Sequence, residues 1–166
     1  MSSSTSSEHH FECKLIWSGA IQGGTSSYDS YSREFRVEIA GKAILIGSSA
    51  AVFRGDPRLH NPEDLLVASL SSCHFLSYLA DAARAHVVVV NYEDEAFGTM
   101  ANIDGKIRFR EVILRPKVWV ERGTDLEKAR RLHHDAHEHC FIANSVNFPV
   151  NNEPTIIERV WRVTAP

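Results

Sequence analysis

The sequence is poor in cysteine and in clustered positive charge, and each shortage excludes a class of protein. Three cysteines in 166 residues are an odd and sparse set, which argues against a disulfide-stapled secreted fold. The 18 lysines and arginines do not cluster and are outnumbered by 21 acidic residues. Neither nucleic acid nor an anionic lipid surface is therefore an expected partner.

Long apolar runs and a leader segment are also missing from the pattern. We see no apolar run that approaches the roughly 20 residues needed to span a bilayer. The opening "MSSSTSSEHH" has neither the basic nor the apolar region of a signal peptide. We therefore expect a cytoplasmic protein in a reducing compartment, with no membrane partner. Any disulfide in such a protein is expected to be catalytic rather than structural.

The organisation along the chain favours one domain. Residues 1–8 are rich in serine and predict a disordered tail, and residues 9–166 predict a single domain. Hydrophobic residues make up 43% of the chain, which is enough for a core without staples.

Strands and helices are predicted in separate blocks, which favours an α+β fold over alternating βαβ units. Helices are predicted from Asn61 to about 85 and from Thr124 or Asp125 to about 140. The expected strands include 11–17, with Cys13 facing the core, and a hairpin at 35–46. One long strand is expected over 106–121, where the alternation slips near Arg110 and predicts a bulge. Two further strands are expected within 86–100, and short strands at 144–150 and 155–163.

The first predicted helix has a strong start and an unusual middle. Asn61 is a good N-cap and Pro62 suits the first helical position. Cys73 lies about three turns in, among small and apolar side chains. Three roles are open to it from the local pattern: a buried small hydrophobe, a metal ligand or a reactive thiol.

Glu63 adds a geometric constraint. It precedes Cys73 by ten residues and so lies about 15 Å away along a straight helix. Glu63 cannot reach the cysteine of its own helix, whereas an antiparallel copy could deliver it. This spacing is consistent with a homodimer that has the helix at its centre.

The second predicted helix carries several histidines and ends at Cys140, which falls on its apolar face. His133 and His137 are four residues apart, so with Cys140 they form a candidate zinc or copper site. We instead expect a solvated face with one or two packed histidines and no bound metal, because no accompanying Cys-x-x-Cys or Glu-x-x-His pattern is present.

Two stretches together, "NPEDLLVASLSSCHFLSYLADAA" and "LHHDAHEHCFIANSV", resemble the OsmC/Ohr family of peroxide reductases, and most closely its OsmC-like branch. The resemblance rests on Asn-Pro-Glu ten residues before a helical cysteine and on a second cysteine that ends a later helix. It implies an intertwined homodimer, in which two long central helices are backed by curved antiparallel sheets.

The resemblance also implies roles for single residues. Cys73 matches the peroxidatic cysteine and Cys140 the resolving cysteine. Glu63 matches the glutamate that holds an arginine across the dimer interface, and Arg54 best matches that arginine. The Ohr-type arginine near the N-terminal Gly-Gly is absent and the loop before Asn61 differs in length, so Arg33 and Arg58 remain alternatives.

The activity implied is thiol-dependent reduction of organic hydroperoxides, and less well of hydrogen peroxide, in the oxidative or osmotic stress response. A Cys73 sulfenate would condense with Cys140 to a disulfide, and a dithiol, thioredoxin-like or lipoyl-type reductant would reset it. No cofactor is expected. The alternative is a non-enzymatic dimeric module that binds thiols, or a metal through His133, His137 and Cys140.

Overall fold

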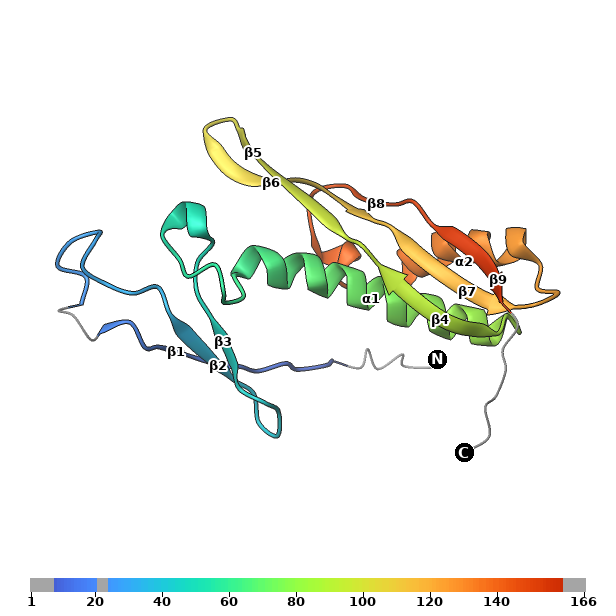
Figure 1. Cartoon of the computed structure of the whole chain (residues 1–166), viewed down its shortest axis with the longest axis horizontal. Helices are drawn as coiled ribbons and strands as arrows, with labels where there is room; N and C mark the ends of the chain where they lie inside the picture. Colours follow the sequence, from blue (N-terminus) through green and yellow to red (C-terminus); the bar gives the residue numbers. More distant parts are fainter. Residues whose placement is uncertain (1–7, 21–23, 160–166) are drawn as a thin grey trace, which may run out of the picture. The chain divides into compact units, whose positions relative to one another are not determined.

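A computed structural model describes residues 8–20 and 24–159 of the chain (Figure 1). The predicted tail at 1–8 lies outside the described residues except for Glu8, as does the end of the strand predicted at 155–163. The chain divides into two compact units, residues 1–65 and residues 66–166. The boundary falls in the first turn and a half of the long helix α1, Pro62–Arg84.

The first unit is a three-stranded antiparallel sheet followed by a short helical turn. The sheet has the order β1-β2-β3, and η2 comes after it. The hairpin predicted at 35–46 is confirmed, with Gly41 in the left-handed region (φ 75°) at its turn. The bounds are β1 Lys14–Trp17, β2 Phe35–Glu38, β3 Leu45–Gly47 and η2 Ala51–Phe53.

Cys13 corrects one expectation from the strand pattern. It precedes β1 and is exposed, and nearby Phe11 is 93% exposed. The prediction that Cys13 packs in a core is therefore wrong for the single chain. Alternation identified one face of the segment, but no described residue of the first unit covers that face at Cys13.

The start of α1 follows its local signals. The Asn61 side chain accepts a hydrogen bond from the backbone N–H of Asp64 at 2.8 Å, as an N-cap should. The helix ends where His86 adopts a left-handed conformation (φ 56°) and the Val87 N–H bonds the Ala82 carbonyl at 2.9 Å. The predicted bounds of the helix are confirmed.

One property of α1 differs from the sequence expectation. By length and composition alone it could cross a membrane, since an 18-residue window has a mean hydropathy of 1.3. Only 28% of that window is buried. Core helices of folded proteins meet the same test, and α1 packs on its own unit through Leu70 and Tyr78. We therefore interpret α1 as a packing helix with one face uncovered in the single chain.

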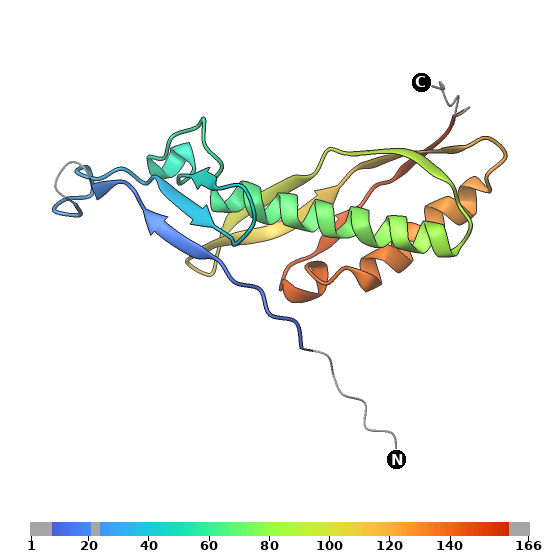
Figure 2. The same cartoon turned by 90° about the horizontal axis from the view of Figure 1, so that it is seen from below.

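The second unit combines the rest of α1 with a second helix and two three-stranded sheets. The sheets have the orders β4-β7-β9 and β5-β6-β8, and Figure 2 shows helix α2 lying beside the C-terminal part of α1. The bounds are β4 Val89–Asp94, β5 Phe97–Ile103, β6 Lys106–Leu114, β7 Pro116–Glu121, α2 Leu126–His139, η3 Ala143–Ser145, β8 Val150–Asn152 and β9 Thr155–Arg159.

The sheets confirm the α+β class but depart from the predicted strands. The strand expected at 144–150 is wrong, because residues 143–145 form the short helix η3 and β8 begins only at Val150. The long strand expected over 106–121 is two strands in different sheets, because the Arg115 N–H leaves the ladder to bond the Asp94 carboxylate at 2.7 Å. β8 and β9 pair in parallel with β6 and β7, so the sheets are not wholly antiparallel. The bulge is confirmed, since the register skips Arg110 between the pairs of Thr99 and Met100.

Two hydrophobic clusters hold the second unit together. One joins α1, α2 and β7 around the fully buried Tyr78 and Ala129, and the Tyr78 hydroxyl donates to the Ala129 carbonyl at 3.1 Å. The other joins α1 to β6 and β8 around Leu70 and Leu114. The unit thereby fixes the middle of α1 from two sides.

A buried histidine pair also lies between the two helices. His74 of α1 and His133 of α2 are each 1% exposed, and His74 Nε2 lies 3.0 Å from His133 Nδ1. The rings are stacked, and Tyr78 stacks on His133 at 4.0 Å between centroids. Burial lowers the pKa of His74 to about 4 and that of His133 to about 3. Both rings are therefore neutral at pH 7.

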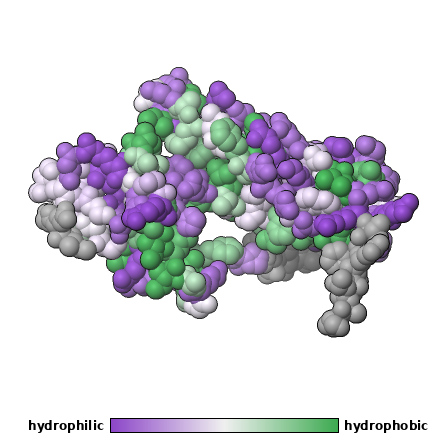
Figure 3. Space-filling view, in the orientation of Figure 1, coloured by the Kyte–Doolittle hydropathy of each residue, from purple (hydrophilic) through white to green (hydrophobic). Residues whose placement is uncertain are grey.

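Large apolar side chains also remain on the surface of both units (Figure 3). Phe141 and Val52 are each 81% exposed, Leu76 is 63% exposed, and Leu15 and Ile107 are each 61% exposed. Patches of this kind commonly mark a contact surface.

Replacing Leu70 tests the second cluster. Leu70→Ala should lower the free energy of unfolding by about 2–5 kcal/mol, because the side chain is fully buried. Ile107→Ala is the matched exposed control and should change it by no more than about 0.5 kcal/mol. Urea titrations followed by circular dichroism measure both. Equal effects of the two substitutions would contradict the packing described.

The histidine pair predicts acid sensitivity. The unfolded chain binds protons near pH 6.5, whereas the folded pair resists them down to about pH 4, so stability is full above pH 6.5 and falls as the pH drops toward 4. The charge of Asp94 partly offsets the lowering of the His74 pKa, whereas His137 lowers that pKa further. Arg130 lowers the pKa of His133 further.

The measurement compares urea midpoints at pH 7.5 and pH 5. The double variant His74→Phe, His133→Phe should lose most of the difference between the two midpoints, whereas His134→Gln, at an exposed position, should keep it. An unchanged pH dependence in the double variant would refute the assignment.

Candidate active site

Two cysteines are brought to the same place by the ends of different elements. Cys73 is half-buried in the middle of α1, and Cys140 is the C-cap of α2 and 1% exposed. Both belong to the second unit. Cys140 lies on the same buried face of α2 as Ala129, Leu132 and Ala136, as its helical spacing predicted.

The two sulfurs are reached by neighbouring backbone N–H groups and lie close together. Cys73 also contributes to the raised pKa of Cys140, and both cysteines are free thiols. The backbone N–H of Ile142 donates to Cys73 Sγ at 3.5 Å, and that of Ala143 donates to Cys140 Sγ at 3.4 Å. The site is thus a dithiol from two helices, with one backbone donor aimed at each sulfur.

The two sulfurs are not equivalent. Burial, followed by the hydrogen bond with Cys73, raises the pKa of Cys140 to about 11, and the Ala143 N–H only partly opposes this. Cys140 is therefore a protonated thiol at neutral pH. Cys73 is the more accessible sulfur of the two, which suits it to meet a molecule from solvent first.

The turn after α2 holds the two backbone donors in place. The Asn144 N–H bonds the Cys140 carbonyl at 3.0 Å, and the Asn144 side chain donates to the Glu138 carbonyl at 2.8 Å. The Ser145 hydroxyl donates to the Phe141 carbonyl at 2.7 Å. These bonds close the turn locally, so the N–H groups of residues 142 and 143 stay directed at the sulfurs.

A groove of about 570 Å³ begins one helical turn beyond Cys73. Its apolar part includes Leu76 and Phe141, and its polar part is organised by Asp81. His139 Nδ1 and Arg84 each lie 2.9 Å from an Asp81 carboxylate oxygen. An apolar molecule that lies along this groove would therefore be close to the dithiol.

Glu63 lies in the first unit, in the first turn of α1. One of its carboxylate oxygens is buried and has no hydrogen-bond partner among the described residues. A buried carboxylate oxygen without a donor is costly. Within the described part of one chain, no cation or hydrogen-bond donor therefore stabilises this carboxylate oxygen of Glu63.

The three candidate arginines have other partners in the first unit. Arg54 forms an ion pair with Asp29 and lies 5.2 Å from the Tyr28 ring centroid. Arg58 is 86% exposed and paired with Asp56 at 2.6 Å. Arg33 lies over the rings of Tyr28 and Tyr31. Among the described residues, none of the three forms an ion pair with Glu63.

The alternative metal site is not assembled. His133 is buried against His74, whereas His134 and His139 are exposed. Across the described ranges, no three histidine, cysteine, aspartate or glutamate side chains are grouped so that they could hold a metal ion. The set of His133, His137 and Cys140 is therefore not brought together, because His133 faces α1.

Sequence reasoning missed the contact between His74 and His133. No role was assigned to His74 from the sequence, and a helical pattern could show only that His133 faces inward. It also missed the hydrogen bond from the Ser71 hydroxyl to Asp94 at 2.5 Å, which ties α1 to β4. Helical spacing identified the inward faces but not which side chains meet across them.

Comparisons with known proteins agree with this fold. A family model described as OsmC-like protein matches residues 55–154. An OsmC-like protein of unknown function from Vibrio cholerae is 33% identical over 89% of this chain and all of its own, with a TM-score of 0.80. No curated protein matches the chain.

Two more distant structures show the same fold. An organic hydroperoxide resistance protein from Elizabethkingia anophelis has a TM-score of 0.67 at 17% identity, over 93% of this chain and 99% of its own. The organic hydroperoxide resistance protein OhrB from Bacillus subtilis has a TM-score of 0.61 at 21% identity, over 87% and 98%. With the model match over more than half of its length, the chain belongs to the OsmC-like protein family.

Proposed function

We propose that this protein is a cysteine-based peroxidase that reduces organic hydroperoxides, and hydrogen peroxide less well. The observation that carries the proposal is that a half-buried thiol on α1 and a buried thiol at the end of α2 accept hydrogen bonds from two neighbouring N–H groups, which brings them close together. Structures of the same fold include proteins named for organic hydroperoxide resistance. The established family membership supports the proposal without fixing the reaction.

In the first step, the Cys73 thiolate attacks the outer peroxide oxygen. The O–O bond breaks, the sulfur becomes a sulfenic acid, and the alkoxide leaves as an alcohol after taking a proton. The Ile142 N–H lies 3.5 Å from Cys73 Sγ and is placed to stabilise negative charge on that sulfur.

In the second step, Cys140 attacks the Cys73 sulfenic sulfur. A disulfide forms and water leaves with the Cys140 proton and the sulfenic oxygen. The N–H groups of Ile142 and Ala143, which are neighbours in the chain, each reach one of the two sulfurs and so hold them close together, which supports this step because a disulfide requires such closeness. An external dithiol, of thioredoxin-like or lipoyl type, then reduces the disulfide by exchange.

The apolar groove beside the dithiol favours peroxides with an organic body. Leu76 and Phe141 line it and are 63% and 81% exposed, so they offer apolar surface to a bound chain. Its polar part, around Asp81, would meet the far end of a long substrate. We place the activity in the cytoplasm and in the response to oxidative or osmotic stress.

We further propose that the working form is a homodimer in which Glu63 serves the partner's site. Glu63 is about 15 Å along α1 from Cys73 of its own chain, and its buried oxygen lacks a donor among the described residues. An antiparallel second helix would bring Glu63 beside the other chain's cysteine, with Arg54 as the arginine that orients the peroxide. The uncovered face of α1 is consistent with this arrangement.

Cysteine substitutions test the chemistry. Cys73→Ser should abolish dithiol-dependent consumption of cumene hydroperoxide, because the attacking sulfur is gone. Cys140→Ser should consume about one equivalent and stop at the sulfenic acid, which dimedone would trap and mass spectrometry would detect. Cys13→Ser is the matched control at an exposed cysteine and should retain turnover. Full turnover by Cys73→Ser would refute the proposal.

Mixed dimers test the role of Glu63. Glu63→Gln and Cys73→Ser should each lose at least about tenfold in kcat/KM as homodimers. Co-refolding the two variants should restore activity, because one site of each mixed dimer then combines an intact Cys73 with the other chain's Glu63. If Glu63 acts within its own chain, no site is intact and the mixture stays inactive.

A further inference from the structure

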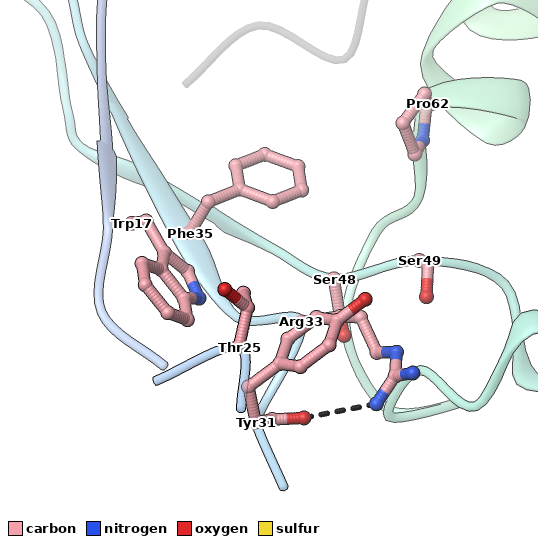
Figure 4. A pocket seen from close by; sticks show the side chains of 8 residues that line it. All are labelled: Trp17, Thr25, Tyr31, Arg33, Phe35, Ser48, Ser49 and Pro62. Carbon is pink, nitrogen blue, oxygen red and sulfur yellow. Dashed lines mark hydrogen bonds between the residues drawn. The ribbon is translucent and has the colours of Figure 1, made fainter. Parts of the chain in front are cut away.

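The first unit contains a pocket of about 380 Å³ that the dithiol chemistry does not use. Figure 4 shows its side chains, which come from β1, from the loop before β2, from β2, from the segment after β3 and from Pro62 at the start of α1. The lining residues are Trp17, Thr25, Tyr31, Arg33, Phe35, Ser48, Ser49 and Pro62.

Arg33 is the charged group of this pocket and is firmly held. Its guanidinium donates to the carbonyls of Tyr31 at 2.9 Å and Tyr28 at 2.7 Å. Its carbon Cζ also lies 4.7 Å and 4.3 Å from the centroids of the Tyr28 and Tyr31 rings. Two carbonyls and two rings therefore fix its position while some of its five N–H groups remain free to donate.

Arg33 also has no acidic ion-pair partner among the described residues. Arg36, Arg54 and Arg58 in the same unit each form an ion pair. Arg33 forms none with a carboxylate in the described part of the chain. A fixed guanidinium without a counter-charge is suited to bind a carboxylate from outside, because the entropy of ordering the side chain is already lost.

The remaining polar groups of the pocket favour a ligand that accepts hydrogen bonds over one that donates them. Ser48 is 1% exposed, and its oxygen accepts the Asp56 N–H at 3.1 Å. Its hydroxyl proton is donated to no described group, so it is available to a ligand. Among the described residues, no aspartate or glutamate lines the pocket. A cationic ligand would find no partner there, whereas a carboxylate would find Arg33 and Ser48.

The walls are apolar and partly flat. Trp17 is fixed by a hydrogen bond from its indole N–H to the Ser32 carbonyl at 2.8 Å and by an edge contact with Tyr31. Phe35 and Pro62 complete the apolar lining. The volume lies within the range of roughly 300–1,000 Å³ that is typical of small-molecule sites.

We propose that this pocket binds a small monocarboxylate with an apolar body, such as a medium-chain acyl or aryl acid, with the carboxylate on Arg33 and the body against Trp17 and Phe35. The site goes beyond the proposed peroxidase and does not need its cysteines. Binding is therefore measured on full-length protein carrying Cys73→Ser and Cys140→Ser, where failure of the peroxidase chemistry has no influence.

The experiment titrates octanoate, with 1-octanol as the uncharged probe, by isothermal titration calorimetry. Octanoate should bind more tightly than 1-octanol. Arg33→Gln should weaken the binding of octanoate roughly ten- to a hundredfold and leave the affinity for 1-octanol unchanged. Arg36→Gln removes the same charge from β2 outside the pocket and should leave octanoate binding intact.

A second measurement does not depend on any change to Arg33. Octanoate added to the ¹⁵N-labelled protein should shift the indole N–H signal of Trp17, which a Trp17→Phe sample identifies. The proposal is overturned by no octanoate binding at millimolar concentration, by equal binding of octanoate and 1-octanol, by equal losses in the Arg33 and Arg36 variants, or by an unshifted Trp17 signal at saturation.

Discussion

The contact between α1 and α2 determines where the two thiols stand. It consists of successive pairs along the helices, in which Tyr78 meets Ala129, His74 meets His133, and Cys73 meets Cys140. A slip by one helical turn, about 5.4 Å, would break all three pairs at once. The position of the two thiols is therefore set in part by the His74–His133 and Tyr78–Ala129 contacts, which lie about two and three turns from Cys140 along α2.

Burial at this contact affects its titratable groups in a consistent way. It lowers the pKa of both histidines and raises that of Cys140, and in each case the neutral form is favoured. A helix contact made of neutral groups avoids the cost of buried charge. It also leaves the half-buried Cys73 as the sulfur of the pair that a peroxide from solvent would meet.

How much could be predicted from the sequence depended on how local each cause was. Both helix starts were predicted because Asn61 and Asp125 cap them through bonds within three residues. The bulge at Arg110 was visible as a slip in alternation. The break at Arg115 was not, because its cause is a bond to Asp94, which lies 21 residues away. Cys13 was misplaced because alternation defines a face without showing whether anything covers it.

The same distinction between local and distant causes applies to the residues of the candidate site. Cys73 and Cys140 could be proposed from helical spacing and a family resemblance, whereas the arginine could not be chosen, because Arg54 finds Asp29 only in the folded unit. Within the part of the chain that the structure describes, Glu63 keeps a buried oxygen without a donor, while each candidate arginine is occupied by an acid or by carbonyls and rings. A buried carboxylate is stable when a cation or donor reaches it. The need for a donor beyond the described residues is the physical reason for proposing a second copy against α1.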